Sequence, residues 1–334
     1  MSITRKEAYF VSTTGEHKIR CLIWQDDEII PIAIFQIAHG VAEHIERYDD
    51  FARFLAGNGF IVCGNDHLGH GKSAGSIEEL NVMPKDGSVR IIDDMHKLYN
   101  IMSKRYPDLP YFMFGHSMGS FCARIYAALF GEDLAGVIFC GTGEIPTSFA
   151  FMEKPLDLIV EKLGADKKYD AVMKLFTKAS NIGIKYPQTS CDWLSMNEEN
   201  VINYMNDPYC GVPFTLGECR TIFSFAVQAC ARDWAYKVPT DLPIFLISGA
   251  KDPVGLFGVG VEATCANLET AGHSPSIMLY PDARHEILNE TQDIREQVYF
   301  NVLQWSIMVL NGINGNPPEF KFPKFDSRVT EQAK

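Results

Sequence analysis

Ser117 has the sequence context of a catalytic nucleophile. It stands at the centre of Gly115-His-Ser-Met-Gly119, after the short apolar run 111–114 and before the unbroken helical pattern 120–130. Strand, Gly-x-Ser-x-Gly and helix in immediate succession are typical of a nucleophile elbow. Such a turn is so tight that only small residues fit two positions before and after the serine. The serine itself takes a strained positive φ that exposes its hydroxyl. We therefore expect Ser117 to act as the nucleophile.

Two residues further along the chain could activate that serine. Asp252 follows the apolar run 242–249, and His285 follows the run 276–280. Each therefore lies just past a predicted buried strand, at the sheet edge where open α/β sheets keep their sites. The order Ser, Asp, His along the chain is the one that α/β-hydrolases use. In such a triad the histidine accepts the serine proton, and the carboxylate holds the imidazole in the right tautomer.

A tetrahedral intermediate needs backbone donors for its negative oxygen, and two amides are candidates. Met118 follows the nucleophile and opens the predicted helix, so its amide has no partner within that helix. Val41 follows Gly40 in the loop after the apolar run 31–38, which should be a central strand. Gly40 would let this loop approach the elbow closely. We expect the amides of Val41 and Met118 to form an oxyanion hole. An ordinary strand-to-helix loop is the alternative interpretation.

A glycine-rich turn from Asp66 to Ser73 contains His67 and His70. Two histidines beside an aspartate could suggest a metal site. The sequence nearby lacks the further acidic or histidine cluster that would complete such a site. We therefore interpret this segment as a tight turn held by polar side chains, and we expect neither a metal nor an organic cofactor.

Apolar runs and helical periodicities alternate along most of the chain, which predicts a mostly parallel sheet with right-handed crossovers. The fold class is therefore α/β, with helices on both faces of a central sheet. An apolar-alternating segment at 8–24 predicts an N-terminal hairpin. We expect further strands at 31–38, 59–64, 111–114, 134–140, 242–249 and 276–280, and helices at 48–57, 88–106, 120–130 and 294–310.

The alternation stops between residues 141 and 240, where helical and loop signals occur without strands. Roughly one hundred residues are too many for a loop in a compact domain, so we expect a helical cap. Its predicted helices are rich in Met, Phe and Cys, and they either form the cap's own core or line an acyl-chain pocket. They span 156–163, 169–178, 197–205 and 221–234. The expected domains are core 1–140, cap insertion 141–240, core 241–312 and a C-terminal tail 313–334.

The composition is that of a soluble globular protein, with 46% hydrophobic and 22% charged residues. The net charge of −12 argues against nucleic acid and anionic membrane surfaces as default partners. No stretch has the features of a signal peptide or the length of an integral membrane segment. The nine cysteines show no CxxC spacing. We therefore expect reduced thiols in a cytoplasmic protein.

Several motifs together resemble the monoacylglycerol lipase and lysophospholipase branch of the α/β-hydrolases. The likeness spans residues 8–312, and its first and last motifs are much more specific than the elbow alone. The motifs are His39-Gly-x-x-Glu-His-x-x-Arg-Tyr48, Asp66-His-x-Gly-His-Gly-x-Ser73, Gly115-His-Ser-Met-Gly119, the strand end at Asp252, and Arg284-His-Glu-Ile-Leu-Asn-Glu290.

The resemblance implies an α/β-hydrolase fold and the activity of a serine carboxylic-ester hydrolase. By this likeness Ser117, Asp252 and His285 take the triad positions. Glu43 and Arg47 match positions that support the pocket for the alcohol part of the ester. The implied substrate is a small-molecule acyl ester, a monoacylglycerol or a lysophospholipid, hydrolysed through an acyl-enzyme.

Other functions stay open at this point. Eukaryotic monoacylglycerol lipases carry a second histidine near bound glycerol, where this chain has Leu288. An aminopeptidase or small-ester esterase of the same superfamily is the first alternative, and a non-catalytic scaffold that senses a ligand is the second. The sequence leaves open the oligomeric state and a transient membrane contact through the cap. A peptidase would need a cap carboxylate for the free amine, for which Glu153, Asp157, Glu198 and Glu199 are available.

Overall fold

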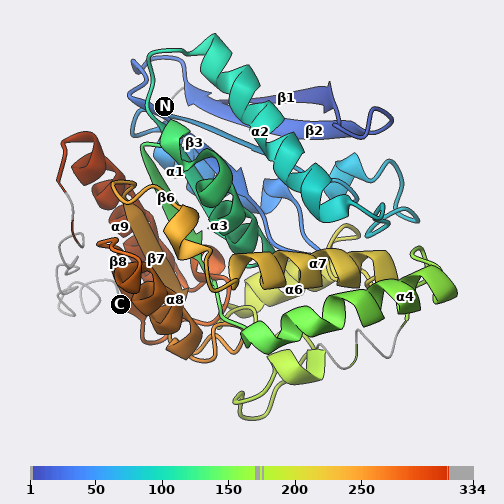
Figure 1. The fold of residues 1–334 in the computed structure, drawn as a ribbon. Helices are drawn as coiled ribbons and strands as arrows, with labels where there is room; N and C mark the ends of the chain where they lie inside the picture. The colour runs from blue at the N-terminus through green and yellow to red at the C-terminus, as the bar shows by residue number, and fades with distance from the viewer. Residues whose placement is uncertain (1–2, 170–173, 175–176, 314, 316–334) are drawn as a thin grey trace, which may run out of the picture.

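The computed structural model describes residues 3–169, 174, 177–313 and 315 (Figure 1). Its strands form one eight-stranded sheet in the order β1-β2-β4-β3-β5-β6-β7-β8. β2 pairs antiparallel with β1 and with β4, and all other neighbours are parallel. The strands are β1 Ile3–Val11, β2 Lys18–Asp26, β3 Ala33–Ala38, β4 Phe60–Asn65, β5 Tyr111–His116, β6 Gly136–Cys140, β7 Ile244–Gly249 and β8 Ser276–Tyr280.

The central strand β3 explains why the parallel strands are continuous apolar runs. All of its residues are buried. Ile34 belongs to the apolar cluster on one face of the sheet, whereas Phe35 and Ile37 belong to the cluster on the other face. A strand covered on both faces needs apolar side chains in both directions, so the alternation of a half-exposed strand is lost.

Helices cover both faces, as the fold class predicts (Figure 1). α1 and α9 contribute to the apolar cluster on one face, and α2, α3 and α8 contribute to the cluster on the other. These helices are α1 Asp49–Ala56, α2 Gly87–Arg105, α3 Met118–Phe130, α8 Val259–Thr270 and α9 Gln292–Leu310. Short 3₁₀ helices are η1 Ile45–Tyr48, η2 Gly71–Ser73, η3 Gly131–Asp133, η5 Ala235–Lys237 and η6 Ile287–Asn289.

The chain between β6 and β7 forms a group of helices beside the sheet (Figure 1). α7 packs against α2, α3 and α4, so this group rests on the helix that follows the elbow. Its helices are η4 Thr147–Met152, α4 Glu153–Leu163, α6 Glu198–Asn206 and α7 Leu216–Ala229. The helix predicted over 169–178 lies largely outside the described residues, as does most of the predicted tail 313–334.

Two helices differ from the sequence prediction. The helix expected over 221–234 is α7, which begins five residues earlier because Thr215 caps it: the Thr215 hydroxyl accepts a hydrogen bond of 3.0 Å from the Glu218 amide. It ends at Ala229 rather than at Trp234. α8 was not predicted, because Gly258 and Gly260 at its start conceal the helical spacing of its buried residues Val261, Thr264, Cys265 and Leu268.

Among the described residues we find no helix with both the length and the apolar character needed to span a membrane. All nine cysteines are free thiols.

Candidate active site

Ser117 lies in a strained turn between β5 and α3. Its φ of 56° falls in the left-handed region that side chains rarely adopt. Neighbouring glycines make this turn sterically possible. A Cβ on Gly115 would overlap the carbonyl oxygen of Gly119, and a Cβ on Gly119 would overlap that of Ala38 in β3. The Ser117 amide donates to the Cys140 carbonyl at 2.9 Å, which ties the turn to β6.

Asp252 and His285 meet beyond the ends of β7 and β8. His285 Nδ1 lies 2.8 Å from Asp252 Oδ2, and both residues are buried. The other carboxylate oxygen, Oδ1, accepts a hydrogen bond of 2.8 Å from the Val254 amide. The carboxylate is thus held on one side by its own turn while the other oxygen orients the imidazole ring.

The second ring nitrogen, His285 Nε2, is buried and has no hydrogen-bond partner among the described residues. His285 and Ser117 line the same cavity of about 150 Å³. The structure therefore brings Ser117, Asp252 and His285 to one sheet edge, with Nε2 as the ring nitrogen that no described residue engages.

The loop after β3 approaches the elbow closely at Gly40. A Cβ at this position would lie 3.1 Å from Ser117 Cβ and 2.6 Å from Glu43 Oε1. The Gly40 amide donates to Glu43 Oε1 at 2.6 Å, so the Glu43 side chain fixes the course of the loop. Val41 lines the cavity beside Ser117, and Met118 is the first residue of α3. Both predicted oxyanion donors therefore border the nucleophile.

Arg47 joins the two carboxylates of the cavity. Its guanidinium contacts Glu43 Oε2 at 2.9 Å and both oxygens of Glu286 at 2.5 and 2.6 Å. It also donates to Asn200 at 3.0 Å and stacks over the Tyr204 ring, 4.8 Å from its centroid. Glu43 and Glu286 line the cavity, and Arg47 stands behind them. Arg47 therefore supports the two carboxylates that form this part of the cavity wall.

Both carboxylates are ionised despite their burial. Burial favours the neutral acid, but the hydrogen bond from His116 and the positive charge of Arg47 hold the pKa of Glu43 well below its usual value. Burial likewise opposes the charge on Glu286, and the charge and hydrogen bonds of Arg47 overcome it and lower the pKa of that carboxyl.

His116, directly before the nucleophile, faces acceptors at both ring nitrogens. Nδ1 lies 3.0 Å from the Tyr48 hydroxyl, whose own proton goes to Glu43, and 3.4 Å from Glu43 Oε1. Nε2 lies 3.1 Å from the His285 carbonyl oxygen. Burial disfavours a charged imidazole, but the hydrogen bond and charge of Glu43 outweigh it and raise the pKa of His116. Two acceptors and a raised pKa both favour the imidazolium, which donates at each end.

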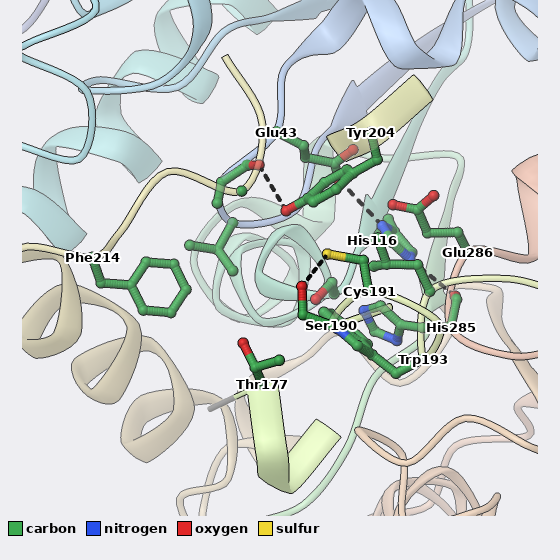
Figure 2. A pocket seen from close by; sticks show the side chains of 15 residues that line it. Glu43, His116, Thr177, Ser190, Cys191, Trp193, Tyr204, Phe214, His285 and Glu286 are labelled. Atoms are coloured by element: carbon green, nitrogen blue, oxygen red, sulfur yellow. Dashed lines mark hydrogen bonds and ion pairs between the residues drawn. The ribbon is translucent and has the colours of Figure 1, made fainter. Parts of the chain in front are cut away.

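Residues from the helical insertion complete the cavity, and its two ends differ (Figure 2). Glu43, His116 and Glu286 gather at one end, and Phe214 lies at the opposite end (Figure 2). The cavity residues contributed by the insertion are Thr177, Ser190, Cys191, Trp193, Leu194, Tyr204, Gly211 and Phe214.

The segment around Trp193 binds directly to the loop that carries His285. The Glu286 amide donates to the Leu194 carbonyl at 2.7 Å, and the Trp193 ring lies 5.0 Å from the His285 ring. Arg284 donates to the carbonyls of Asp192 and Ser195 at 2.6 and 3.1 Å. The insertion therefore lines the cavity and also holds the loop that carries His285 from outside the sheet.

The glycine-rich turn at 66–73 is held by polar side chains, as its sequence indicates. Asp66 accepts hydrogen bonds from the amides of Ile45 and Lys72 at 2.9 and 3.0 Å. His67 Nε2 lies 3.2 Å from the His39 carbonyl. Burial lowers the pKa of His67 to about 3, so this imidazole is neutral. Asp66 and the neutral His67 thus tie this turn to the segments that carry Ile45 and His39.

Several residues of the site did not emerge from the sequence. His116 and Glu286 stand directly beside Ser117 and His285, within motifs that were recognised, so their position was a usable signal. Trp193, Tyr204 and Phe214 lie in the insertion, where no local pattern separates a pocket residue from a core residue.

The family profile described as "Serine aminopeptidase, S33" matches residues 30–292. The chain belongs to this family of serine hydrolases. Its eight-stranded, mostly parallel sheet with helices on both faces is the α/β-hydrolase fold that the resemblance implied.

Curated relatives and solved structures agree with this family and indicate to which branch of it the chain belongs. The chain is 27% identical to a monoglyceride lipase of Mus musculus, over 89% of each protein. It is 25% identical to a monoacylglycerol lipase of Mycolicibacterium smegmatis, over 92% of this chain and 99% of the relative. A thermostable carboxyl esterase from Bacillus coagulans, solved with glycerol, superposes with a TM-score of 0.86 at 32% identity, over 92% and 99% of the two chains. This family member therefore lies in the monoacylglycerol lipase branch and is a lipase- or esterase-type serine hydrolase.

Proposed function

We propose that this enzyme hydrolyses the carboxylic ester of a monoacyl lipid, with Ser117 as nucleophile, His285 as general base and Asp252 as the residue that orients the base. The observation that carries the proposal is the 2.8 Å contact between His285 Nδ1 and Asp252, which leaves Nε2 for the cavity that Ser117 also lines. The same three residue types meet in this way in other serine hydrolases.

The chemistry follows from this arrangement. His285 Nε2 takes the proton of the Ser117 hydroxyl while Oγ attacks the ester carbonyl. The amides of Val41 and Met118 then donate to the negative oxygen of the tetrahedral intermediate. As the intermediate collapses, the C–O bond to the alcohol breaks and His285 returns the proton to the leaving oxygen. Water, deprotonated by His285, attacks the acyl-enzyme in the same way and releases the fatty acid.

The two ends of the cavity suggest how the ester lies in it. The polar end, with Glu43, His116 and Glu286, suits the hydroxyls of an alcohol, and the end with Phe214 suits the acyl chain. The names of the curated relatives support a monoacylglycerol as substrate. Leu288 is buried in the core cluster beside α9, so it supplies no polar group to the alcohol. A lysophospholipid therefore stays within the proposal.

The aminopeptidase alternative, which the family description keeps in view, lacks support from the carboxylates suggested for it. Glu153 and Asp157 lie at a different cavity, together with α7 residues, and Glu198 lies at another. Glu199 is exposed on α6 and does not line the cavity that contains Ser117. The carboxylates that do line the site, Glu43 and Glu286, are already paired with Arg47. An amine would have to compete with a guanidinium for them.

A substrate series tests the proposal. We expect kcat/KM for p-nitrophenyl esters to rise from acetate towards longer acyl chains until the pocket is full, because each buried methylene contributes about 0.8 kcal/mol. Monoacylglycerols and lysophosphatidylcholine should be hydrolysed, and aminoacyl amides should not. A steady fall from acetate onwards would favour a small-ester esterase, and cleavage of the amides alone would favour a peptidase.

The Ser117→Ala variant is the control for this series. It should lose turnover and labelling by a fluorophosphonate, with a change in unfolding free energy of about 1 kcal/mol or less, because only one hydroxyl is removed. Undiminished labelling of this variant would remove Ser117 from the mechanism.

A further inference from the structure

Three side chains of different chemistry meet where the sheet domain touches the helical insertion. His44 belongs to the loop that leads from β3 into η1. Asp207 follows the last residue of α6, and Cys210 comes three residues later. One nitrogen of His44, one carboxylate oxygen of Asp207 and the sulfur of Cys210 all lie within 4.8 Å of one another. None of the three belongs to the cavity that contains Ser117.

The three residues are held in this arrangement by their surroundings. His44 Nε2 lies 2.8 Å from Asp207 Oδ2. The other oxygen of Asp207 accepts from the Tyr209 amide at 2.8 Å, and the Cys210 amide donates to the Asp207 carbonyl at 3.0 Å. This tight turn presents the carboxylate and the thiol towards the same imidazole.

The burial of these three side chains and their access to solvent are suitable for a bound ion. His44 and Cys210 are each 7% exposed, so an ion between them would be largely shielded from water. The Asp207 side chain is 29% exposed, which leaves one side of the cluster open to solvent. An ion could therefore enter along the carboxylate and be held by the imidazole and the sulfur behind it.

From this juxtaposition we infer that His44, Asp207 and Cys210 form a site for Zn²⁺ or a similarly thiophilic divalent cation. Imidazole nitrogen, thiolate sulfur and carboxylate oxygen are the ligands that Zn²⁺ takes in proteins, and three of them leave the fourth tetrahedral position to water. Ligand atoms around such an ion are separated by about 3.4–3.8 Å. On binding, the Cys210 thiol releases its proton to solvent and the neutral His44 ring carries its proton on Nδ1, so that Nε2, the thiolate and the Asp207 carboxylate face the ion. Small side-chain rotations move His44 Nε2 and Asp207 Oδ2 apart and bring the sulfur to this distance.

The site is structural and lies apart from the chemistry of ester hydrolysis. It joins the loop after β3 to the connection between α6 and α7. These segments already meet at Ala42, whose carbonyl accepts from the Tyr204 hydroxyl at 3.1 Å and from the Gly211 amide at 3.0 Å. A bound ion adds metal–ligand bonds to this junction and holds the insertion against the loop that carries Val41.

Cobalt titration of the full-length reduced protein tests the site without using enzyme activity. Co²⁺ bound by a thiolate has a charge-transfer band in the near ultraviolet, and tetrahedral Co²⁺ has strong visible d–d bands. We expect both in the wild-type protein at one equivalent, with displacement by Zn²⁺. Cys210→Ser should abolish the charge-transfer band, and His44→Gln or Asp207→Asn should weaken cobalt binding at least tenfold.

Matched variants and a second measurement make the test decisive. Cys219→Ser removes a half-buried thiol from α7, and His17→Gln removes an exposed histidine; neither should change the titration. Zn²⁺ should raise the melting temperature of the wild type and not that of Cys210→Ser. If Cys210→Ser does not fold, the cobalt affinities of His44→Gln and Asp207→Asn test the site instead. A wild type without the thiolate band, or the same affinity in these variants, would mean that the cluster is a packing contact between core and insertion.

Discussion

The Nε2 atom of His116 lies 3.1 Å from the carbonyl oxygen of His285, while Nδ1 of the same ring lies 3.4 Å from Glu43. Glu43 in turn holds the Gly40 amide at 2.6 Å. One imidazole beside Ser117 therefore connects the loop of the proposed general base, His285, to the loop of the proposed oxyanion donor, Val41. Because both loops must keep their positions while the proton moves, His116 is a positioning residue for the proposed reaction.

Replacing His116 should affect turnover more than binding. His116→Gln cannot donate at both ends, so we expect kcat to fall by about tenfold to a hundredfold with a small change in KM. The imidazolium is present below the raised pKa of His116 and lost above it, so wild-type kcat should decline as pH rises through that value. The variant should lack this alkaline decline. Steady-state kinetics across pH measures both effects, and the same decline in the variant would assign it to another group.

A buried carboxyl outside the site should make stability depend on pH. Glu218 is fully buried, and neither of its oxygens has a hydrogen-bond partner among the described residues, although His70 Nε2 lies 3.5 Å from Oε1. Burial raises the pKa of Glu218 to about 8. In the unfolded chain a glutamate titrates near about 4.3. Between these values only the folded state keeps the proton, so the free energy of unfolding falls as pH rises, by at most about 1.4 kcal/mol per pH unit.

Glu218→Gln tests this assignment because it keeps the shape of the side chain and removes the titration. Urea unfolding at several pH values from 5 to 8 should show a flatter pH dependence and a more stable protein at pH 8 than the wild type. Glu262→Gln, at an exposed position of α8, should change neither. An unchanged slope in Glu218→Gln would show that other groups cause the pH dependence.

The sequence was most informative where local geometry demands particular residues. The elbow requires Gly115 and Gly119 because a Cβ at either position would overlap backbone, and such a demand is visible in a motif. The strand ends before Asp252 and His285 were equally visible, because buried strands are apolar runs. The polar residues of a site come directly after such runs. Trp193 and Tyr204 could not be assigned, since their proximity to the site depends on how the insertion packs over the sheet. Local residue patterns within the insertion do not reveal that packing.

The ion pairs of Arg47 should contribute strongly to stability because they are buried. Arg47→Met keeps much of the side-chain volume but leaves Glu43 and Glu286 without their cation, which should cost about 3–5 kcal/mol in unfolding free energy. Lys237→Met removes a cation from an exposed pair with Asp233 and should change the unfolding free energy little, because water screens the pair. Urea denaturation compares the two. Equal, small losses would contradict the role of Arg47 as the counter-ion of the cavity wall.

The last prediction concerns the oxyanion donor expected from Val41. A methyl group at Gly40 would lie 3.1 Å from Ser117 Cβ and 2.6 Å from Glu43 Oε1, so Gly40→Ala must shift the loop or the Glu43 carboxylate that holds it. Either shift displaces the Val41 amide. Loss of one oxyanion donor costs on the order of a hundredfold in kcat, and KM should change little because the donor acts mainly when charge develops on the oxygen.

Two milder variants separate this effect from general damage to the site. Val41→Ala and Met118→Leu keep both amides, so each should retain most of the wild-type kcat. Circular dichroism and melting temperature should show that Gly40→Ala is folded before its kinetics are compared with theirs. A folded Gly40→Ala enzyme with near-wild-type kcat would mean that the second donor comes from another segment. The close approach of Gly40 to Ser117 would then serve only the packing of the loop against the elbow.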